Sequence, residues 1–289
     1  MIILFSFINS QDVICLATII KMTSYVKIII CEETKMQPFQ TIQIHHMKEN
    51  QTHDKHMPVT TEAPLNICIN TYLFDQIMRT PGDEKAHIAG LLFSHQIITT
   101  RSDLKAFSVD TSDSVDTVKV TVSTPFSPAF FYQKTNNIPE INRNVNQKLS
   151  YSQATICIDD LNNCQPLRSQ TRSTHAAILF DNHFNRIASK EDVGRHNALD
   201  KVIGQAILDQ RLESIYLLVL SSRVSHELMM KVLRTPIKYI LSVSRPTSLA
   251  INLARKNGIH LACLSKDEGF LIFTGMDGFC QTKNLEADI

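Results

Sequence analysis

The apolar stretch Ile215-Tyr-Leu-Leu-Val-Leu220 decides the fold, because it begins the most regular part of the chain and has the length of a buried strand. A helical pattern follows at 225–234, and then come an apolar run at 239–243, a helical pattern at 248–256 and an apolar run at 260–264. Short strands that alternate with helices form βαβ units, whose strands lie parallel. This order therefore predicts an α/β fold with a parallel sheet.

The chain before residue 165 carries fewer predicted elements. Strands are predicted at 65–70 and 115–122, and helices at 83–94 and 151–163. In the first strand, Leu65, Ile67 and Ile69 alternate with other residues and should therefore share one face. Asp83 is placed to cap the first turn of the first helix.

The chain is predicted to have three parts, at residues 1–60, 61–150 and 151–289. The first part is expected to be either a mobile segment or a stretch upstream of a later start, because its polar end shows little apolar periodicity and Met22 and Met36 offer later starts. The second is a smaller α+β part, and the third is the α/β domain.

Charge and hydropathy exclude several classes of protein. Lysine and arginine number 29 against 28 aspartates and glutamates, so the net charge of +1 gives no field that would hold nucleic acid or a membrane surface. Polar residues interrupt the apolar segment 1–30, which leaves no run of about 18 apolar residues for a membrane helix. Any recognition of an anion must therefore be local.

The seven cysteines are scattered, and no two of them are spaced as C-x-x-C. An odd number without such spacing argues against a disulfide framework and against a structural zinc site. A reducing cytoplasm is the simplest setting. Cys157 and Cys164 fall on or beside the helix predicted at 151–163, so they are expected to be core or helix-face thiols.

The densest polar motif is the block Lys190–Gly204, in which an acidic pair and a glycine turn lead into a helix. Arg195, His196, Asp200 and Lys201 lie on that helix. The donor-rich start of a helix is suited to bind an anion. A capped helix with a solvated charged face explains the same pattern equally well.

Two strand-to-helix junctions repeat this chemistry, one with Arg223 and Ser225 and the other with Arg245. At the carboxyl ends of parallel strands, arginine and free backbone amides can bind a phosphate. Ordinary capping by serine and threonine would explain one such junction, whereas two adjacent ones favour a ligand cleft. His87 is interpreted as solvated surface, and His175 as a structural residue where a loop enters the sheet.

Seven of these segments together resemble the FdhD family, whose members are required for formate dehydrogenase activity. The matching segments are Glu62–Leu65, Met78–Asp83, Gln165–Leu167, Thr174–Ala177, Glu191–Lys201, Arg223–Ser225 and Ser248–Ala250. They extend from about Glu62 to Gly275, and the block Glu191–Lys201 is highly specific.

The resemblance implies a fold similar to cytidine deaminase, with a mixed or parallel sheet, flanking helices and no zinc, in a homodimer. It also implies transfer of persulfide sulfur from a cysteine desulfurase to the molybdenum cofactor of formate dehydrogenase, in its molybdopterin guanine dinucleotide form. The segment that binds this cofactor in the family corresponds here to Phe270, Leu271, Ile272, Phe273, Thr274 and Gly275. The remaining cleft residues implied are Arg195, His196, Arg223, Ser225 and Arg245.

The chain departs from the family at the loop that carries sulfur. Where the family has Cys-Gly-x-Cys-Gly, the best local match is Ser127–Lys134, and Ala129 and Tyr132 occupy the two cysteine positions. Neither side chain can carry a persulfide, so no catalytic residue is predicted at this loop, and Cys157 is the fallback. Two functions remain: a sulfur-carrying accessory protein, or an inactive scaffold that binds the cofactor or regulates a molybdoenzyme.

Overall fold

The computed structural model describes residues 3–8, 14–22, 25–30, 36–49, 51–124, 126, 138–145, 147–265 and 268–281. The chain divides into two compact units, Met1–Gln37 and Pro38–Ile289. The first unit contains the antiparallel strands β1 (Ile3–Ile8), β2 (Ile14–Met22) and β3 (Tyr25–Ile30). No helix in the described residues is long and apolar enough to cross a membrane.

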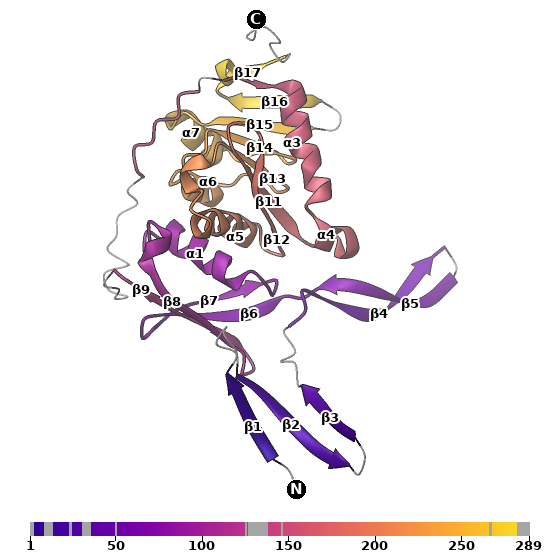
Figure 1. Ribbon diagram of the computed structural model, residues 1–289. Coiled ribbons are helices and arrows are strands. Elements are labelled where there is room, and N and C mark those ends of the chain that lie inside the picture. The colour runs from indigo at the N-terminus through magenta and orange to yellow at the C-terminus, as the bar shows by residue number, and fades with distance from the viewer. Residues whose placement is uncertain are drawn as a thin grey trace, which may run out of the picture. The chain divides into compact units, whose positions relative to one another are not determined.

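A six-stranded mixed sheet forms the centre of the second unit (Figure 1), with the strand order β12-β11-β13-β14-β15-β16. These strands are β11 (His175–Phe180), β12 (Arg186–Asp192), β13 (Leu217–Leu220), β14 (Tyr239–Ser242), β15 (His260–Ser265) and β16 (Gly269–Thr274). The three strands β13, β14 and β15 are parallel, as the sequence predicts, and the other pairings are antiparallel. The predicted α/β class is confirmed.

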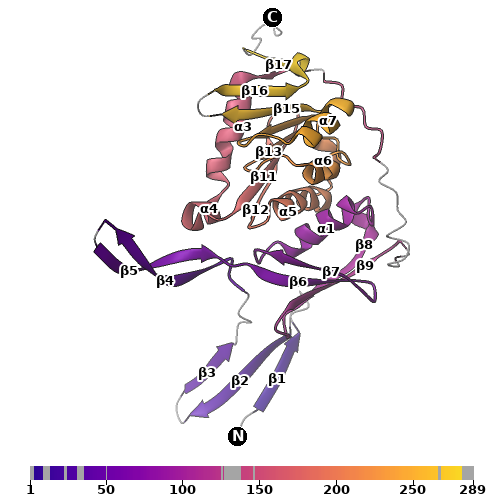
Figure 2. The same ribbon diagram turned by 180° about the vertical axis from the view of Figure 1, so that it is seen from behind.

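Helices cover both faces of this sheet, and Figures 1 and 2 show α3 along one face and α5, α6 and α7 on the other. They are α3 (Tyr151–Asn163), α4 (Pro166–Thr171), α5 (Arg195–Leu208), α6 (His226–Val232) and α7 (Ser248–Lys256). In β13, Leu218 and Leu220 belong to one core, and Leu217 and Val219 to the other. Burial on both faces explains why this strand is continuously apolar rather than alternating.

A four-stranded sheet with the order β7-β6-β9-β8 precedes the large one. Its strands are β6 (Ala63–Ile69), β7 (Tyr72–Arg79), β8 (Leu104–Asp110) and β9 (Asp116–Val122). The predicted alternation is confirmed, because Leu65, Ile67 and Ile69 are all fully buried in the same core as α1 (Glu84–Ser94). The capping role predicted for Asp83 is wrong: its carboxylate makes no capping bond and pairs with Lys190 instead.

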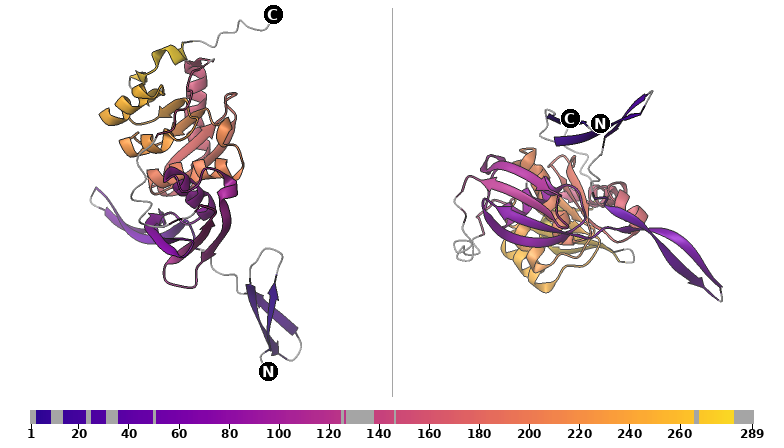
Figure 3. Two further views of the ribbon diagram at one scale, coloured as in Figure 1. Left: turned by 90° about the vertical axis from the view of Figure 1, so that its left-hand side faces the viewer. Right: turned by 90° about the horizontal axis from the view of Figure 1, so that it is seen from below.

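Residues 39–60 form an antiparallel hairpin of β4 (Phe39–Lys48) and β5 (Gln51–Thr60), where the sequence predicts no regular structure. The two views of Figure 3 show it extending away from the two larger sheets of its unit. Its strands are largely exposed and polar on both faces, so the apolar alternation that marks a half-buried strand is missing from the sequence. The remaining elements of the described residues are the parallel pair β10 (Leu149–Ser150) and β17 (Phe279–Cys280), and the short 3-10 helices Arg101–Asp103, Leu212–Ser214 and Met276–Gly278.

His87 lies inside the protein, so its assignment to the solvated surface is wrong. Its side chain on α1 has an exposed fraction of 0%. Burial, followed by the charges of Lys201 and Lys231, lowers the pKa of His87 well below its usual value of 6.5. The imidazole is therefore held neutral in the folded protein.

We expect His87 to make the protein less stable in acid. As the pH falls below about 6.5, the unfolded chain takes up a proton at His87 while the folded protein does not, so the free energy of unfolding falls. Above that pH the residue contributes no pH dependence. Between pH 6.5 and 5.5 the wild type should lose about 1 kcal/mol more than His87→Leu, measured by urea unfolding. The exposed control His183→Leu should follow the wild type, and parallel curves for wild type and His87→Leu would contradict the assignment.

Candidate functional site

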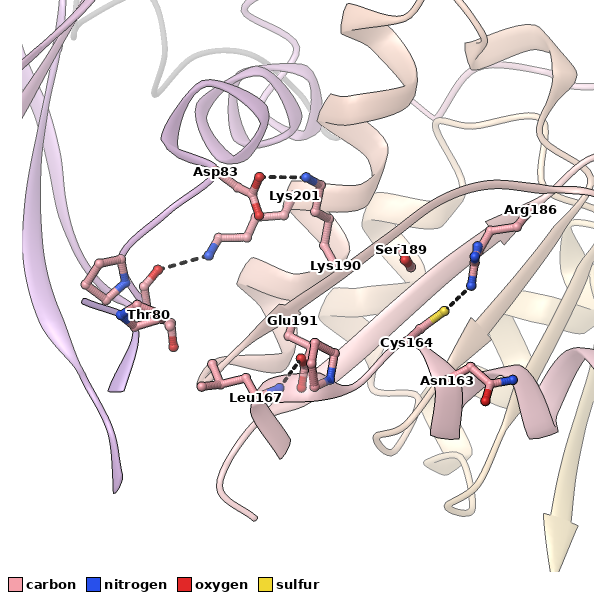
Figure 4. Close-up of a pocket in the computed structure, with 13 residues that line it drawn as sticks. Thr80, Asp83, Asn163, Cys164, Leu167, Arg186, Ser189, Lys190, Glu191 and Lys201 are labelled. Atoms are coloured by element: carbon pink, nitrogen blue, oxygen red, sulfur yellow. Dashed lines mark hydrogen bonds and ion pairs between the residues drawn. The ribbon is translucent and has the colours of Figure 1, made fainter. Parts of the chain in front are cut away.

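A pocket of about 450 Å³ lies beside β12, the first strand of the large sheet. Figure 4 shows its lining residues. Most come from β12, from the end of α3 and the start of α4, and from the segment that leads into α1, and Pro38 and Lys201 of α5 complete the lining. Cys164, Arg186 and Lys190 are among them. The pocket thus joins segments that are far apart in the chain.

Cys164 lines this pocket directly after α3, and its sulfur accepts a hydrogen bond from the guanidinium of Arg186. The same guanidinium pairs with the carboxylate of Asp160 at 3.1 Å. A neighbouring cation stabilises a thiolate, which is the nucleophilic form of cysteine. The arrangement therefore places a largely buried thiol beside a guanidinium that is itself paired with Asp160, at the wall of the pocket.

The fallback residue Cys157 lies in a different environment. It has an exposed fraction of 2% and packs in the core between α3 and the sheet. Burial, and then the nearby charge of Asp160, raise the pKa of Cys157 to about 12, and burial also raises the pKa of Cys263. These thiols are suited to packing rather than to nucleophilic attack. The prediction that Cys164 is a core or helix-face thiol is confirmed, because Cys164 has an exposed fraction of 8% and belongs to the same core cluster as Cys157. Its contact with Arg186, 22 residues away, leaves no local signature in the sequence.

Glu191 fixes the wall of the pocket next to Cys164. Its carboxylate accepts hydrogen bonds from the backbone N–H groups of Leu167 at 2.8 Å and Arg168 at 2.9 Å, and from the hydroxyl of Thr174 at 2.8 Å. A carboxylate that accepts amide bonds at the start of a helix both caps the helix and is stabilised by it. Glu191 thereby holds α4, and the turn that carries Cys164, against β12.

The polar residues predicted to form one charged face of α5 lie in different surroundings, and two of them, Asp200 and Lys201, are buried. Asp200 and Lys201 are each 1% exposed, so neither the anion site nor the solvated face describes them. Lys201 pairs with Asp192 at 2.7 Å, and Asp200 pairs with Lys231 and accepts a bond from Ser94. These pairs join α5 to its neighbours and are structural.

Arg195, in the first turn of α5, belongs to a cluster of positive charge around His175. Burial, followed by the charges of Arg168, Arg195 and Arg223, lowers the pKa of His175. The Nε atom of Arg195 and the Nδ1 atom of His175 are buried and have no hydrogen-bond partner among the described residues. No ion pair joins Arg195 or Arg223 to a carboxylate in that part of the chain. Guanidinium groups without a counterion are suited to bind an anion.

Three of the other predicted cleft residues have protein partners. His196 lies 3.3 Å from Glu227, and the guanidinium of Arg245 pairs with Glu268. The hydroxyl of Ser225 accepts a bond from an amide in the first turn of α6, as expected of a capping residue. These contacts give each residue a structural role, and an anion at Arg245 would have to compete with a carboxylate.

The predicted cofactor segment Phe270–Gly275 runs along one edge of the large sheet, from the carboxyl end of the parallel strands to their amino end. Phe270 pairs with Leu264 at the carboxyl end of the parallel strands, whereas Gly275 lies at the opposite end against His260. Thr274 is buried, and its hydroxyl bonds to the backbone of Ile259. The segment is an edge strand. Only its first residues therefore lie at the same end of the strands as Arg223 and Arg245.

The positions assigned to the family's two cysteines, Ala129 and Tyr132, lie outside the described residues. The loss of those cysteines is a property of the sequence, and it stays a prediction that this loop carries no sulfur.

Comparison with known proteins identifies the family. Residues 60–279 match the model of the FdhD/NarQ family. The sulfur carrier protein FdhD of Sulfurisphaera tokodaii is 32% identical over 236 residues, which cover 75% of this chain and 89% of that protein. The sulfur carrier protein FdhD of Mycolicibacterium paratuberculosis is 28% identical over 269 residues, which cover 84% of this chain and 99% of that protein.

A solved structure has a similar fold. It is the crystal structure of a protein from Desulfotalea psychrophila described as a formate dehydrogenase accessory protein. The TM-score is 0.70 at 22% sequence identity, and the match covers 84% of this chain and 99% of the other. At that identity the likeness concerns the fold, and the family rests on the sequence match: this chain belongs to the FdhD/NarQ family.

Proposed function

We propose that this chain is a sulfur-carrying accessory protein of formate dehydrogenase. It receives sulfur as a persulfide from a cysteine desulfurase and passes it to the molybdopterin guanine dinucleotide form of the molybdenum cofactor, which is its substrate. Membership of the FdhD/NarQ family and the names of its relatives support this proposal. The observation that carries it is the thiol of Cys164 beside Arg186 at the wall of an open pocket.

Cys164 takes the role that the family's loop cysteines have lost in this sequence. Its thiolate attacks the terminal sulfur of the desulfurase persulfide, so that a sulfur–sulfur bond forms on Cys164 as the bond within the donor breaks. The donor leaves as a thiolate and takes up a proton. One sulfur atom moves and no external oxidant is needed. The guanidinium of Arg186 donates a hydrogen bond to the sulfur of Cys164 and so orients the reacting atom.

The arginine cluster supplies the site for the anionic part of the substrate. Arg195 and Arg223 lie close enough to His175 to lower its pKa, and neither pairs with a carboxylate among the described residues. A nucleotide diphosphate is an anion that two guanidinium groups can bind through paired hydrogen bonds. The first residues of β16 lie at the same edge of the sheet. Assembly as a homodimer is part of the same proposal.

Complementation tests this function. In a bacterial strain that lacks its own accessory protein, expression of the wild-type chain should restore formate oxidation. Cys164→Ala should abolish the restoration, and the matched buried control Cys157→Ala should retain it. Both variants should accumulate to the same level, which blotting checks. Equal restoration by Cys164→Ala and wild type would show that sulfur does not travel on Cys164.

A binding scaffold is the second candidate, and the unpaired arginines favour it. Such a protein would hold the nucleotide without moving sulfur. Purified wild type should then bind a guanine nucleotide, and Arg223→Gln should bind it at least about tenfold more weakly. In the strain that lacks its own accessory protein, neither the wild type nor any variant should restore formate oxidation. A wild-type chain that binds the nucleotide and restores no formate oxidation would favour this candidate over the first.

A further inference from the structure

The β4–β5 hairpin carries four histidines within twelve residues, His45, His46, His53 and His56. The register of the hairpin determines which of them meet. His46 lies directly opposite His53, whereas His45 lies opposite Asp54. Side chains of directly opposite residues point to the same face, and adjacent residues point to opposite faces. The four imidazoles are therefore divided between two faces.

On one face of the hairpin, polar side chains form hydrogen bonds with one another. The Nδ1 atom of His45 lies 2.6 Å from a carboxylate oxygen of Asp54, and the side-chain amide of Gln43 donates to the other oxygen at 2.9 Å. His56, opposite Gln43, belongs to this face. The carboxylate thus serves as partner to two side chains, and His45 is already engaged.

The other face presents a pair of imidazoles. The ring centroids of His46 and His53 are 5.6 Å apart, and the ring planes are tilted by 59°. No hydrogen bond or ion pair engages either ring within the described part of the chain. Neutral imidazole nitrogens are good ligands for zinc, copper and nickel. Nothing in the proposed sulfur chemistry uses this pair.

The spacing of the two rings suits a shared metal ion. An imidazole nitrogen binds zinc at about 2.0 Å, so two rings on one tetrahedral ion have their centroids roughly 5 Å apart. A wider angle between the two nitrogen–metal bonds increases this separation to about 6 Å. The observed separation of 5.6 Å lies between these limits. The described residues contain no group of three or more His, Cys, Asp or Glu side chains placed to hold a metal. Any ion here would have two protein ligands.

We propose that His46 and His53 form a two-imidazole site for a divalent transition-metal ion of the zinc, copper and nickel class, with water completing the coordination. The ion bridges the two strands, so it stabilises the paired form of a hairpin that has few other contacts.

Two exposed lysines lie near the site, Lys48 two residues after His46 and Lys55 two residues after His53. Their charges oppose the ion and are screened by salt, so affinity should rise with ionic strength.

Titration of the full-length protein with Ni²⁺ tests the site. The wild type should bind one ion, and His46→Gln and His53→Gln should each weaken binding about tenfold or more, because the loss of a ligand costs no less than the loss of its supporting partner. On the other face, the matched controls His45→Gln and His56→Gln should change it less than about twofold. All four changes are on an exposed hairpin, so the unfolding midpoint without metal should stay the same.

Hydrogen exchange of the backbone amides is a second, independent measurement of metal binding at this site. Saturating Ni²⁺ should slow exchange of the backbone amides of residues 43–56 in the wild type and leave them unchanged in His53→Gln. Equal affinities for wild type, His46→Gln and His53→Gln would overturn the proposal. So would an equal loss in His45→Gln, which would place the ion on the opposite face.

Discussion

Replacing Lys201 by methionine is expected to lower the free energy of unfolding by about 3 to 5 kcal/mol. The ammonium of Lys201 lies 2.7 Å from the carboxylate of Asp192, and the two side chains are 2% and 0% exposed. Without Lys201 the carboxylate stays buried with only neutral donors, among them the backbone N–H groups of Thr80 and Gly194. An unpaired buried charge costs far more than a lost surface ion pair. Urea unfolding measures the loss.

The double variant Asp192→Asn with Lys201→Met provides the control. Removing both charges leaves no buried ion without a partner, so the double variant should lose less stability than the sum of the two single variants. The difference should exceed about 1 kcal/mol, since residues in direct contact couple by that order. Additive losses would mean that the two side chains do not form the buried pair.

Replacing Gly204 by alanine should also destabilise the protein severely, by about 3 kcal/mol or more. The helices α1 and α5 touch at Gly90 and Gly204. A Cβ atom on Gly204 would lie 1.8 Å from the carbonyl oxygen of Ala86, and one on Gly90 would lie 1.9 Å from that of Asp200. Both obstacles are backbone atoms, so the helices must move apart to admit a methyl group. The higher helix propensity of alanine offsets only about 1 kcal/mol of this cost.

Gln205→Ala is the control for Gly204→Ala, because it changes the next residue on the same helix. Its side chain is half-buried and bonds only to Asp209 one turn later among the described residues. The expected change is within about 0.5 kcal/mol. Thermal unfolding of the three proteins compares them directly. A midpoint for Gly204→Ala that equals the wild-type value would show that the two helices are not in contact there.

The C-terminal elements follow from the sequence because each of them is fixed locally. α3 and α7 begin and end where their predicted patterns do, and β13, β14 and β15 lie parallel as the βαβ order requires. Each of these helices also has a capping residue just before it, Ser150 and Thr247. Local signals and global topology agree here, which makes such elements predictable.

The burial of polar side chains could not be predicted from the sequence in the same way. His87 and Lys201 are polar, yet both lie inside because α1 and α5 pack closely enough at their glycines to enclose them. Contacts between residues more than 100 positions apart, such as Lys201 with Thr80, leave no spacing pattern. The hairpin was missed for the opposite reason, since both its faces are polar and exposed.

The residues predicted for the site are placed by the fold in different surroundings. The family motif includes Arg195 and Arg223, whose charges act on His175 in the fold, and their role in binding stays a prediction. Cys164 adjoins the matching segment Gln165–Leu167, but only the fold shows that Arg186 reaches it. The lost loop cysteines suggested an inactive protein, whereas we propose the pocket thiol of Cys164 as an alternative carrier.

Mapping of the transferred sulfur tests the central claim most directly. The protein is incubated with a cysteine desulfurase and cysteine, and its peptides are analysed by mass spectrometry without reduction. We expect one additional sulfur atom on the peptide that contains Cys164, and none in Cys164→Ala. Sulfur found on Cys68 or Cys280 instead, or on no cysteine of the wild type, would contradict the account.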